Sequence, residues 1–284
     1  MGDGVGTVSA VHRYPVKSML GEVLNSARIT GRGVDGDRAH ALIDDETGKV
    51  ISVKRPRRWG RIFELSAATG VDGVEVRFPH GGVHHIDDPE LPARLSDFFG
   101  RSVSVASTPP DGASFDEAWV RDLKDGADPY LGLPSRLEEG DELIDAGLFM
   151  NAQDNFFNLG PVHLVTTGTT DRLRKLAPGS RFDPHRFRPN LVIETDADGF
   201  VETDWLDRTI TIGEVQLAVT FNVPRCVMTT LAQGDLPADP DVLRTITRHN
   251  QVDPGFGTTY PCVGVYADVR TPGLVAAGDA VTID

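Results

Sequence analysis

The chain has 284 residues, of which 39% are apolar and 25% charged, and this composition is typical of a globular protein and excludes collagen, low-complexity disorder and a coiled coil. The formal charge of −14 at pH 7 argues against a general binder of nucleic acids or anionic membranes, because such proteins need a net positive surface. Two cysteines are too few for a secreted disulfide framework, and the sequence shows neither an apolar run long enough for a membrane helix nor the residue order of a signal peptide. We therefore expect a cytoplasmic protein without a nucleic-acid or membrane partner.

The first hundred residues predict mostly β-strands. Short β-branched and apolar stretches separated by turn residues cover residues 6–14, 22–30, 40–44, 49–53, 61–67, 74–78 and 83–87. A hairpin turn is expected at 44–48, and a helix is expected to begin after residues 87–90 and to end near Gly100. Residues 31–36 match G-x-G-x-x-G, but a hairpin follows them instead of a helix, so we interpret these glycines as turn residues.

Residues 111–142 are rich in Pro, Gly and Asp with little alternation, which predicts a connecting segment between a first region, 1–110, and a second region, 143–284. In the second region, residues 169–171 are expected to cap a helix over 171–177, and another helix is expected near 241–250. Strands are predicted at 162–167, 189–194, 209–213, 215–221, 226–231, 260–269 and 280–284. The class is a β-rich α+β fold with closed or strongly curved sheets, because so many short strands must hide their edges.

Cationic side chains occur in three segments that lie far apart in the sequence, at residues 14–18, 36–38 and 186–190. In the last one Pro189 is expected to keep Arg188 extended, so that Arg186, Arg188 and Asn190 share one face of a strand. Two guanidinium groups and an amide on one face would suit a phosphorylated heterocycle. The ordinary alternative is a face that forms surface salt bridges with some of the 42 acidic residues.

Two further features have both a functional and an ordinary interpretation. Thr167, Gly168 and Thr169 precede a predicted helix, where hydroxyl and N–H groups can bind an anion or merely cap the helix. Residues 54–61 hold five basic side chains and a tryptophan, which indicates the rim of a substrate or cofactor site more readily than an RNA-binding patch.

The two cysteines differ in their surroundings. Cys226 is predicted where a loop enters a strand, beside Arg225, whose charge would favour the thiolate. A thiolate is a soft ligand that selects soft or sulfur-rich metal centres, whereas a lone buried cysteine is usually a small apolar residue. Cys262 lies inside an apolar strand pattern and fits a core position.

The order and spacing of four short motifs carry a resemblance to a known family. These are YPVKS at 14–18, GDR at 36–38, RFRPNLVI at 186–193, and RC followed by TT at 225–230. With them the chain resembles MOSC-domain proteins preceded by the MOSC N-terminal β-barrel domain, the arrangement of the mitochondrial amidoxime-reducing components and their bacterial relatives. The resemblance covers nearly the whole chain and implies two β-barrel-like regions, the N-terminal one at 1–110 and the MOSC domain at 143–284.

The resemblance also implies a molybdenum cofactor between the two regions, with Cys226 as the catalytic thiolate that binds molybdenum and Arg225 as the residue that stabilises it. Pro224 stands where some relatives carry a hydroxyl residue, so one contact to the cofactor is in doubt. The matching residues that would hold the phosphate and the pterin are Lys17, Ser18, Arg38, Arg188 and Asn190, with further hydrogen bonds from Thr167, Gly168 and Thr169.

The activity that this implies is an oxidoreductase that removes oxygen from a small N-hydroxylated compound such as an amidoxime. The electrons would come from a separate flavin, iron–sulfur or haem protein, because two cysteines cannot hold a cluster with four thiolates. One alternative is a non-catalytic carrier of the cofactor or a sulfur-transfer protein; the sulfurases that carry a MOSC domain add a large domain that binds pyridoxal phosphate, for which 284 residues leave no room. A third hypothesis is an RNA-binding module that uses residues 54–61.

Overall fold

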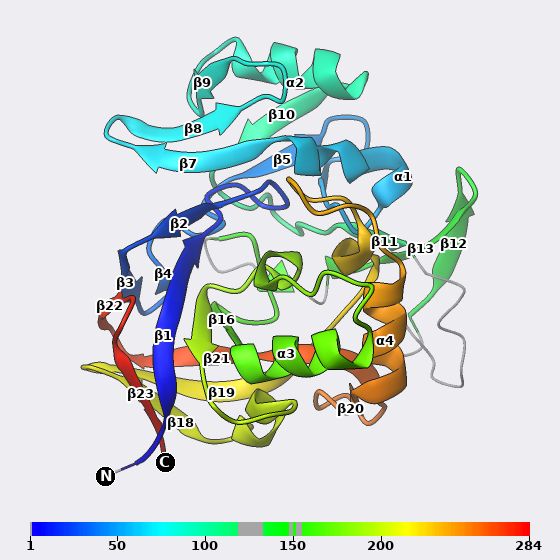
Figure 1. The fold of residues 1–284 in the computed structure, drawn as a ribbon. Coiled ribbons are helices and arrows are strands. Elements are labelled where there is room, and N and C mark those ends of the chain that lie inside the picture. Colours follow the sequence, from blue (N-terminus) through cyan, green and yellow to red (C-terminus); the bar gives the residue numbers. More distant parts are fainter. Residues whose placement is uncertain (1, 119–132, 148–149, 152–154) are drawn as a thin grey trace.

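The computed structural model describes residues 2–118, 133–147, 150–151 and 155–284 (Figure 1). Strands predominate, and the helices of the described part are short: α1 (Pro56–Trp59), α2 (Leu91–Phe99), α3 (Thr167–Leu176) and α4 (Asp241–His249). No helix in this described part has the length and hydrophobicity that a membrane span requires.

Seven strands close into a barrel, which confirms the predicted β-rich class with a closed sheet. Around the barrel their order is β16 (Val162–Thr166), β17 (Leu191–Glu194), β1 (Asp3–Arg13), β23 (Ala280–Ile283), β18 (Thr209–Ile212), β19 (Val215–Pro224) and β21 (Tyr260–Thr271). The ring closes because β16 also pairs with β21. Two short strands extend it, β2 (Glu22–Leu24) beside β1 and β20 (Gln251–Val252) beside β21.

The barrel core is built from the apolar members of these strands. Residues such as Val11, Leu191 and Leu217 are fully buried, and on β19 the positions on either side of Leu217 are more exposed. β1 lies between β17 and β23, so the first strand of the chain belongs to the barrel together with strands from the C-terminal half. The chain then leaves the barrel, forms the N-terminal region and returns at β16 (Figure 1).

The N-terminal region consists of small sheets packed around a second core that contains Leu42, Ile62, Leu65 and Leu95. Helix α2 covers this core and ends at Gly100 in the left-handed conformation, as the sequence predicted. Two three-stranded sheets surround this core. One consists of β5 (Ala41–Asp44), β6 (Lys49–Val50) and β10 (Val103–Ala106), and the other consists of β7 (Ser66–Gly70), β8 (Gly73–Arg77) and β9 (Val83–His85).

A further small sheet lies against the barrel and consists of β3 (Ser26–Thr30), β4 (Gly33–Val34) and β22 (Gly273–Ala276). Gly31 lies in the turn between β3 and β4, and Gly36 lies in the turn after β4. Gly33 is the first residue of β4; it has a φ of +100° and leaves no room for a side chain, because a Cβ atom there would lie 2.5 Å from the carbonyl oxygen of Pro161. The interpretation as turn residues is therefore confirmed for Gly31 and Gly36 and wrong for Gly33.

The expected connecting segment at 111–142 is partly a sheet. The strands β11 (Asp116–Ala118) and β12 (Ser135–Glu138) both pair with β13 (Asp141–Asp145), while residues 119–132 of the segment lie outside the described part of the chain. A two-stranded ladder of β14 (Met150–Asn151) and β15 (Phe157–Asn158) leads from there toward the barrel.

Three local predictions were wrong. Gly60–Glu64 and Val227–Thr230 are 3₁₀ helices where strands were expected, because contacts with the surrounding core override the strand preference of their β-branched and aromatic residues. Helix α3 begins at Thr167 and not near 171, since the hydroxyl of Thr166 accepts the backbone N–H of Thr169 as an N-cap.

Candidate cofactor site

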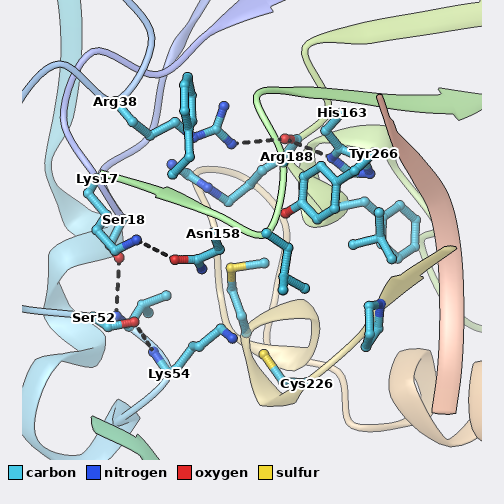
Figure 2. A pocket seen from close by; sticks show the side chains of 18 of the residues that line it. Lys17, Ser18, Arg38, Ser52, Lys54, Asn158, His163, Arg188, Cys226 and Tyr266 are labelled. Atoms are coloured by element: carbon cyan, nitrogen blue, oxygen red, sulfur yellow. Dashed lines mark hydrogen bonds between the residues drawn. The ribbon is translucent and has the colours of Figure 1, made fainter. Parts of the chain in front are cut away.

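A cavity lies where the end of the barrel meets the N-terminal region (Figure 2). Both parts contribute side chains: Lys17 and Lys54 come from the N-terminal region, whereas Arg188 and Cys226 come from segments that join barrel strands. The residues around it are Lys17, Ser18, Arg38, Ser52, Val53, Lys54, Phe156, Phe157, Asn158, Leu159, Gly160, His163, Phe187, Arg188, Asn190, Val223, Pro224, Arg225, Cys226, Met228 and Tyr266. The structure thus brings together seven of the ten site residues that the sequence pointed to.

Backbone strain is concentrated around this cavity. Six described non-glycine residues have a positive φ, and four of them line the cavity: Ser18 at 67°, Arg38 at 48°, Leu159 at 55° and Arg188 at 55°. Such a conformation costs roughly 1–2 kcal/mol for a residue with a side chain, so the surrounding structure must hold it. Strain of this kind is typical of binding sites.

The prediction that Arg186, Arg188 and Asn190 share one strand face was wrong. Residues 184–187 form a 3₁₀ helix, and Arg188 adopts the left-handed conformation instead of the extended one that Pro189 favours. The two arginines consequently diverge. Arg186 points away from the cavity and donates only to backbone carbonyls, those of Arg181, Thr229, Leu231 and Pro237.

Arg188 points into the cavity and keeps most of its donors free. Its Nη1 donates to the carbonyl of Met19 at 2.6 Å, and its guanidinium carbon lies 4.2 Å from the centre of the Tyr14 ring. Among the described residues no carboxylate lies within ion-pair distance, and its Nε and Nη2 groups have no protein acceptor. Burial, with help from Arg38, lowers the pKa of Arg188 to about 10. A buried guanidinium with free donors is suited to an anionic ligand.

Lys17 and Arg38 add positive charge beside Arg188. Nζ of Lys17 donates to the Phe156 carbonyl at 2.7 Å and to Oδ1 of Asn158 at 2.6 Å, and burial with the nearby cations holds the pKa of Lys17 well below its usual value. Arg38 is paired with Asp37; burial lowers the pKa of Arg38, but the charge and the hydrogen bond of Asp37, together with other nearby groups, raise it overall. The cavity therefore contains more buried positive charge than the described carboxylates balance.

Asn190 and Ser18 mainly hold the walls of the cavity. Oδ1 of Asn190 accepts the backbone N–H of His163 at 3.1 Å, and its Nδ2 donates to the carbonyl of His12 at 3.4 Å. The hydroxyl of Ser18 accepts the backbone N–H of Val53 at 3.3 Å. Asn190 has one amide hydrogen left for a ligand.

Cys226 lies two residues beyond the end of β19, at the N-cap position of the 3₁₀ helix Val227–Thr230, so the predicted entry into a strand was wrong. Burial raises the pKa of its thiol, and Lys54 is the cation that opposes this most strongly. Figure 2 shows the Lys54 side chain extending toward Cys226. Nζ of Lys54 also pairs with Glu117 at 2.8 Å; although burial lowers the pKa of Lys54, the charges of Glu117 and Cys226 outweigh it and raise that pKa.

Arg225 has a different position from the one expected beside the thiol. Its guanidinium donates to the carbonyl of Val263, to the carbonyl of Phe187 at 3.1 Å and to Nε2 of His163 at 2.6 Å. Burial lowers its pKa to about 10. Arg225 lowers the pKa of the Cys226 thiol less than Lys54 does, and burial outweighs both.

Thr167, Gly168 and Thr169 are not brought to the cavity. The hydroxyls of Thr166 and Thr169 each donate to Glu202 at 2.6 Å, and the amide of Thr195 donates to Oγ1 of Thr167 at 3.0 Å. In the described structure these residues cap α3 and attach it to the barrel, which is the ordinary interpretation of the motif.

The basic run at 54–61 is largely neutralised within the protein. Arg55 is buried and pairs with Glu138 at 2.9 Å and Glu139 at 3.1 Å, and Arg58 pairs with Asp44 at 3.0 Å. Lys54 alone of this run lines the cavity. The ion pairs disfavour the RNA-binding hypothesis, since a free positive surface is what such binding needs.

Sequence reasoning included Lys54 only as part of the basic run interpreted as the rim of a substrate or cofactor site, and it did not consider His163 or Tyr266. Lys54 was counted within the basic run, and His163 lies inside an otherwise apolar strand. A histidine at a fully buried strand position is a signal that could have been used, because buried polar groups require partners. Cys262 is buried as predicted, and burial raises its pKa to about 12.

The donor set fits a molybdenum cofactor. Its phosphate would be matched by Arg188 and Lys17, which are buried without a described carboxylate partner, and a soft metal would be matched by the sulfur of Cys226. Asn190 and Arg38 offer hydrogen-bond donors of the kind that a pterin accepts.

Comparisons with known proteins agree with this arrangement. The family model described as MOSC domain matches residues 153–282, and the one described as MOSC N-terminal beta barrel domain matches residues 5–119. The mitochondrial amidoxime-reducing components 1 and 2 of Homo sapiens are each 32% identical to this chain over 98% of its length, and the alignments cover 82% and 83% of those relatives. The component 2 of Bos taurus is 24% identical over 98% of this chain and 83% of its own.

Among solved structures, the YuaD protein from Bacillus subtilis aligns over 100% of this chain and 98% of its own, with a TM-score of 0.47 and 10% identity. The relatives above are named as mitochondrial, so the expected cytoplasmic location stays a prediction. Because both family models match in the expected order and a relative is 32% identical over 98% of this chain, this chain belongs to the family of MOSC-domain proteins with an N-terminal MOSC β-barrel domain.

Proposed function

We propose that this protein binds a molybdenum cofactor in the cavity and reduces small N-hydroxylated compounds with electrons from a separate reductase. The observation that carries the proposal is the convergence of buried, unbalanced cations with the thiol of Cys226 in one cavity. The names of the relatives, amidoxime-reducing components, support this class of substrate.

Each residue has a distinct task in this proposal. Arg188 would bind the cofactor phosphate through two parallel N–H groups, and Lys17 would add a third donor and a charge. Cys226 would bind the metal through its sulfur after losing its proton, and Lys54 would stabilise the resulting negative charge. Thr167, Gly168 and Thr169 have no task here, because they hold α3.

The reaction consumes two electrons and two protons, and converts an N–OH group into N–H and water. The molybdenum cofactor, when bound, supplies the oxygen-atom transfer. The protein excludes water from the cavity, orients the substrate beside Cys226, and holds a proton on Nζ of Lys54, which the Glu117 carboxylate keeps charged. The second proton would come from solvent.

The test uses protein from a host that makes the cofactor. Wild type, C226A, R188A and the matched control C262A are compared for molybdenum by mass spectrometry, for pterin fluorescence after oxidation, and for reduction of benzamidoxime with a reduced viologen dye. We expect near-stoichiometric metal and turnover in wild type and C262A, less metal or pterin in R188A, and no turnover in C226A. Undiminished benzamidoxime reduction by C226A would reject the mechanism.

A loaded protein that is not reoxidised by benzamidoxime would support the non-catalytic carrier instead. Rapid mixing of the reduced protein with benzamidoxime distinguishes the two functions, because only the enzyme shows reoxidation that depends on substrate.

A further inference from the structure

His163 lies in the cavity wall near Arg188 and Tyr266 (Figure 2), and it contacts three residues of that wall. Its backbone N–H donates to Oδ1 of Asn190 at 3.1 Å. In its side chain, Nδ1 lies 3.2 Å from the carbonyl oxygen of Arg188, and Nε2 lies 2.6 Å from Nη2 of Arg225. The imidazole is 2% exposed and leans against the Tyr266 ring at a centroid distance of 5.3 Å.

These partners fix the tautomer of His163. A carbonyl oxygen can only accept, so Nδ1 carries the proton, and a guanidinium can only donate, so Nε2 carries the lone pair. A second proton on Nε2 would oppose the Arg225 donor. Burial and the Arg225 charge accordingly keep the pKa of His163 well below its usual value, and the ring is neutral.

The strained backbone of Arg188 depends on this donor. Arg188 has a φ of 55° and precedes a proline, which is an unfavourable combination for a residue with a side chain. Its carbonyl accepts from Nδ1 of His163 and from Nη2 of Arg38 at 3.3 Å. These two bonds hold the conformation from which the Arg188 guanidinium reaches the cavity.

We propose that His163, as the neutral Nδ1–H tautomer, is a positioning residue that holds Arg188 in the conformation that binds an anionic ligand. The proposal rests on the proposed function for the identity of the natural ligand, a phosphorylated cofactor. The anion site itself can be examined with inorganic phosphate in cofactor-free protein, independently of any activity.

Two amide substitutions separate the two ring nitrogens. In H163N the amide nitrogen takes the place of Nδ1 and can still donate to Arg188, whereas in H163Q the amide oxygen takes the place of Nε2 and can still accept from Arg225. H163L removes both functions. By calorimetry, we expect H163N to bind phosphate within about threefold of wild type and H163Q and H163L to bind at least about tenfold more weakly, which is a loss of about 1.4 kcal/mol.

Rescue by asparagine but not by glutamine is the decisive readout, because a purely structural role would weaken both alike. Thermal melts verify that each variant is folded at the temperature of the titration. In addition, ¹⁵N NMR of the histidine side chains of wild type should find Nδ1 of His163 protonated and Nε2 bare.

Four results would overturn the inference. In wild type these are a proton on Nε2 of His163, or no binding of phosphate. In the variants they are phosphate binding by H163Q as tight as that of wild type, or loss of phosphate binding in H163N. The role of His163 and the proposed function can be separated. If the phosphate affinities follow the expected order but the protein never carries molybdenum or pterin, the role of His163 is supported and the proposed function is rejected.

Discussion

Two arginines separated by one residue have opposite roles in this protein. Arg186 is fully buried and all its hydrogen bonds run to backbone carbonyls, whereas Arg188 keeps donors free in a cavity. A guanidinium that satisfies several carbonyls stabilises the fold, because each carbonyl left without a donor in the interior costs about 1–3 kcal/mol. A buried cation with free donors lowers the stability of the ligand-free protein instead.

The first prediction compares R186M with R188M in cofactor-free protein. R186M should lower the free energy of unfolding by roughly 2–4 kcal/mol and leave phosphate binding measurable. R188M should abolish phosphate binding and raise the free energy of unfolding by up to about 3 kcal/mol, since the lowered pKa of Arg188, about 10, reflects the cost of burying its charge. Urea denaturation and calorimetry measure both quantities. If R188M destabilises as much as R186M, the assignment of opposite roles is wrong.

Residue types could be predicted from the sequence better than residue directions. Lys17, Arg38, Arg188 and Cys226 do meet in one cavity, as their chemistry and the family resemblance implied. The direction of Arg188 could not be predicted from its local sequence. Its strained left-handed backbone before a proline is held by two donors to its carbonyl oxygen, His163 on β16 and Arg38, and both lie far away in sequence. Lys54 was likewise hidden in a run of arginines that pair with acidic residues far away in sequence.

At the scale of elements, the pairing of β16 with β21 closes the barrel and also sets the place of His163. The strands approach each other closely at Gly264, which has a φ of +78°. A Cβ atom there would lie 2.5 Å from the carbonyl oxygen of Leu164 and 2.6 Å from Nε2 of His163. The absence of a side chain at this position therefore serves both the sheet and the cavity.

The second prediction is that G264A lowers the free energy of unfolding by roughly 3 kcal/mol or more and weakens phosphate binding, because it displaces His163. Gly257 provides a matched control: its φ is +77°, and a Cβ atom there would meet nothing within 4 Å. G257A should therefore cost only about 1 kcal/mol and leave phosphate binding unchanged. Equal losses in the two variants would mean that the backbone conformation, and not the close approach, requires glycine at 264.

Strands such as β18, β19 and β21 could be predicted within a few residues. β18 and the first part of β19 alternate between buried and more exposed positions, and the first part of β21 is a continuous apolar, buried run. The 3₁₀ helices at 60–64 and 227–230 could not, since they consist of residues with strand preference whose side chains pack into a core built by other elements. The sheet of β11, β12 and β13 was missed because its strands lack a strong apolar pattern in the sequence. Ion pairs, such as that of Lys49 with Asp116, contribute to holding it in place.

At the scale of the whole molecule, buried neutral histidines link stability to pH. Burial, and to a smaller extent His185, lowers the pKa of His12 to about 4, and burial also lowers the pKa values of His40 and His163. As the pH falls below 6.5, the unfolded chain takes up protons that the folded protein does not, so stability decreases. His185 acts in the opposite direction, because its hydrogen bond with Asp183 raises its pKa. The stability that this pair contributes is present at low pH and is lost as the pH rises through the raised pKa of His185.

The third prediction is that the free energy of unfolding falls between pH 6.5 and 4, by on the order of 3 kcal/mol from His12 alone. Urea denaturation at a series of pH values measures this slope. H12Q should flatten it, and H80Q, at an exposed histidine, is the matched control. A slope of full size in H12Q would show that other groups cause the acid sensitivity.

The central position of β1 in the barrel has a consequence for how the protein is made. A ribosome delivers β1 first, but its neighbour β17 arrives only after the N-terminal region, and its neighbour β23 only after the other barrel strands have been synthesised. Until then one strand of the barrel has only β2 beside it, and its open edge is exposed to aggregation. Because the carbonyl of Asn190, directly before β17, bonds to His12 on β1, the cavity wall also forms only then. Loading of any cofactor in this cavity must therefore follow the synthesis of β17.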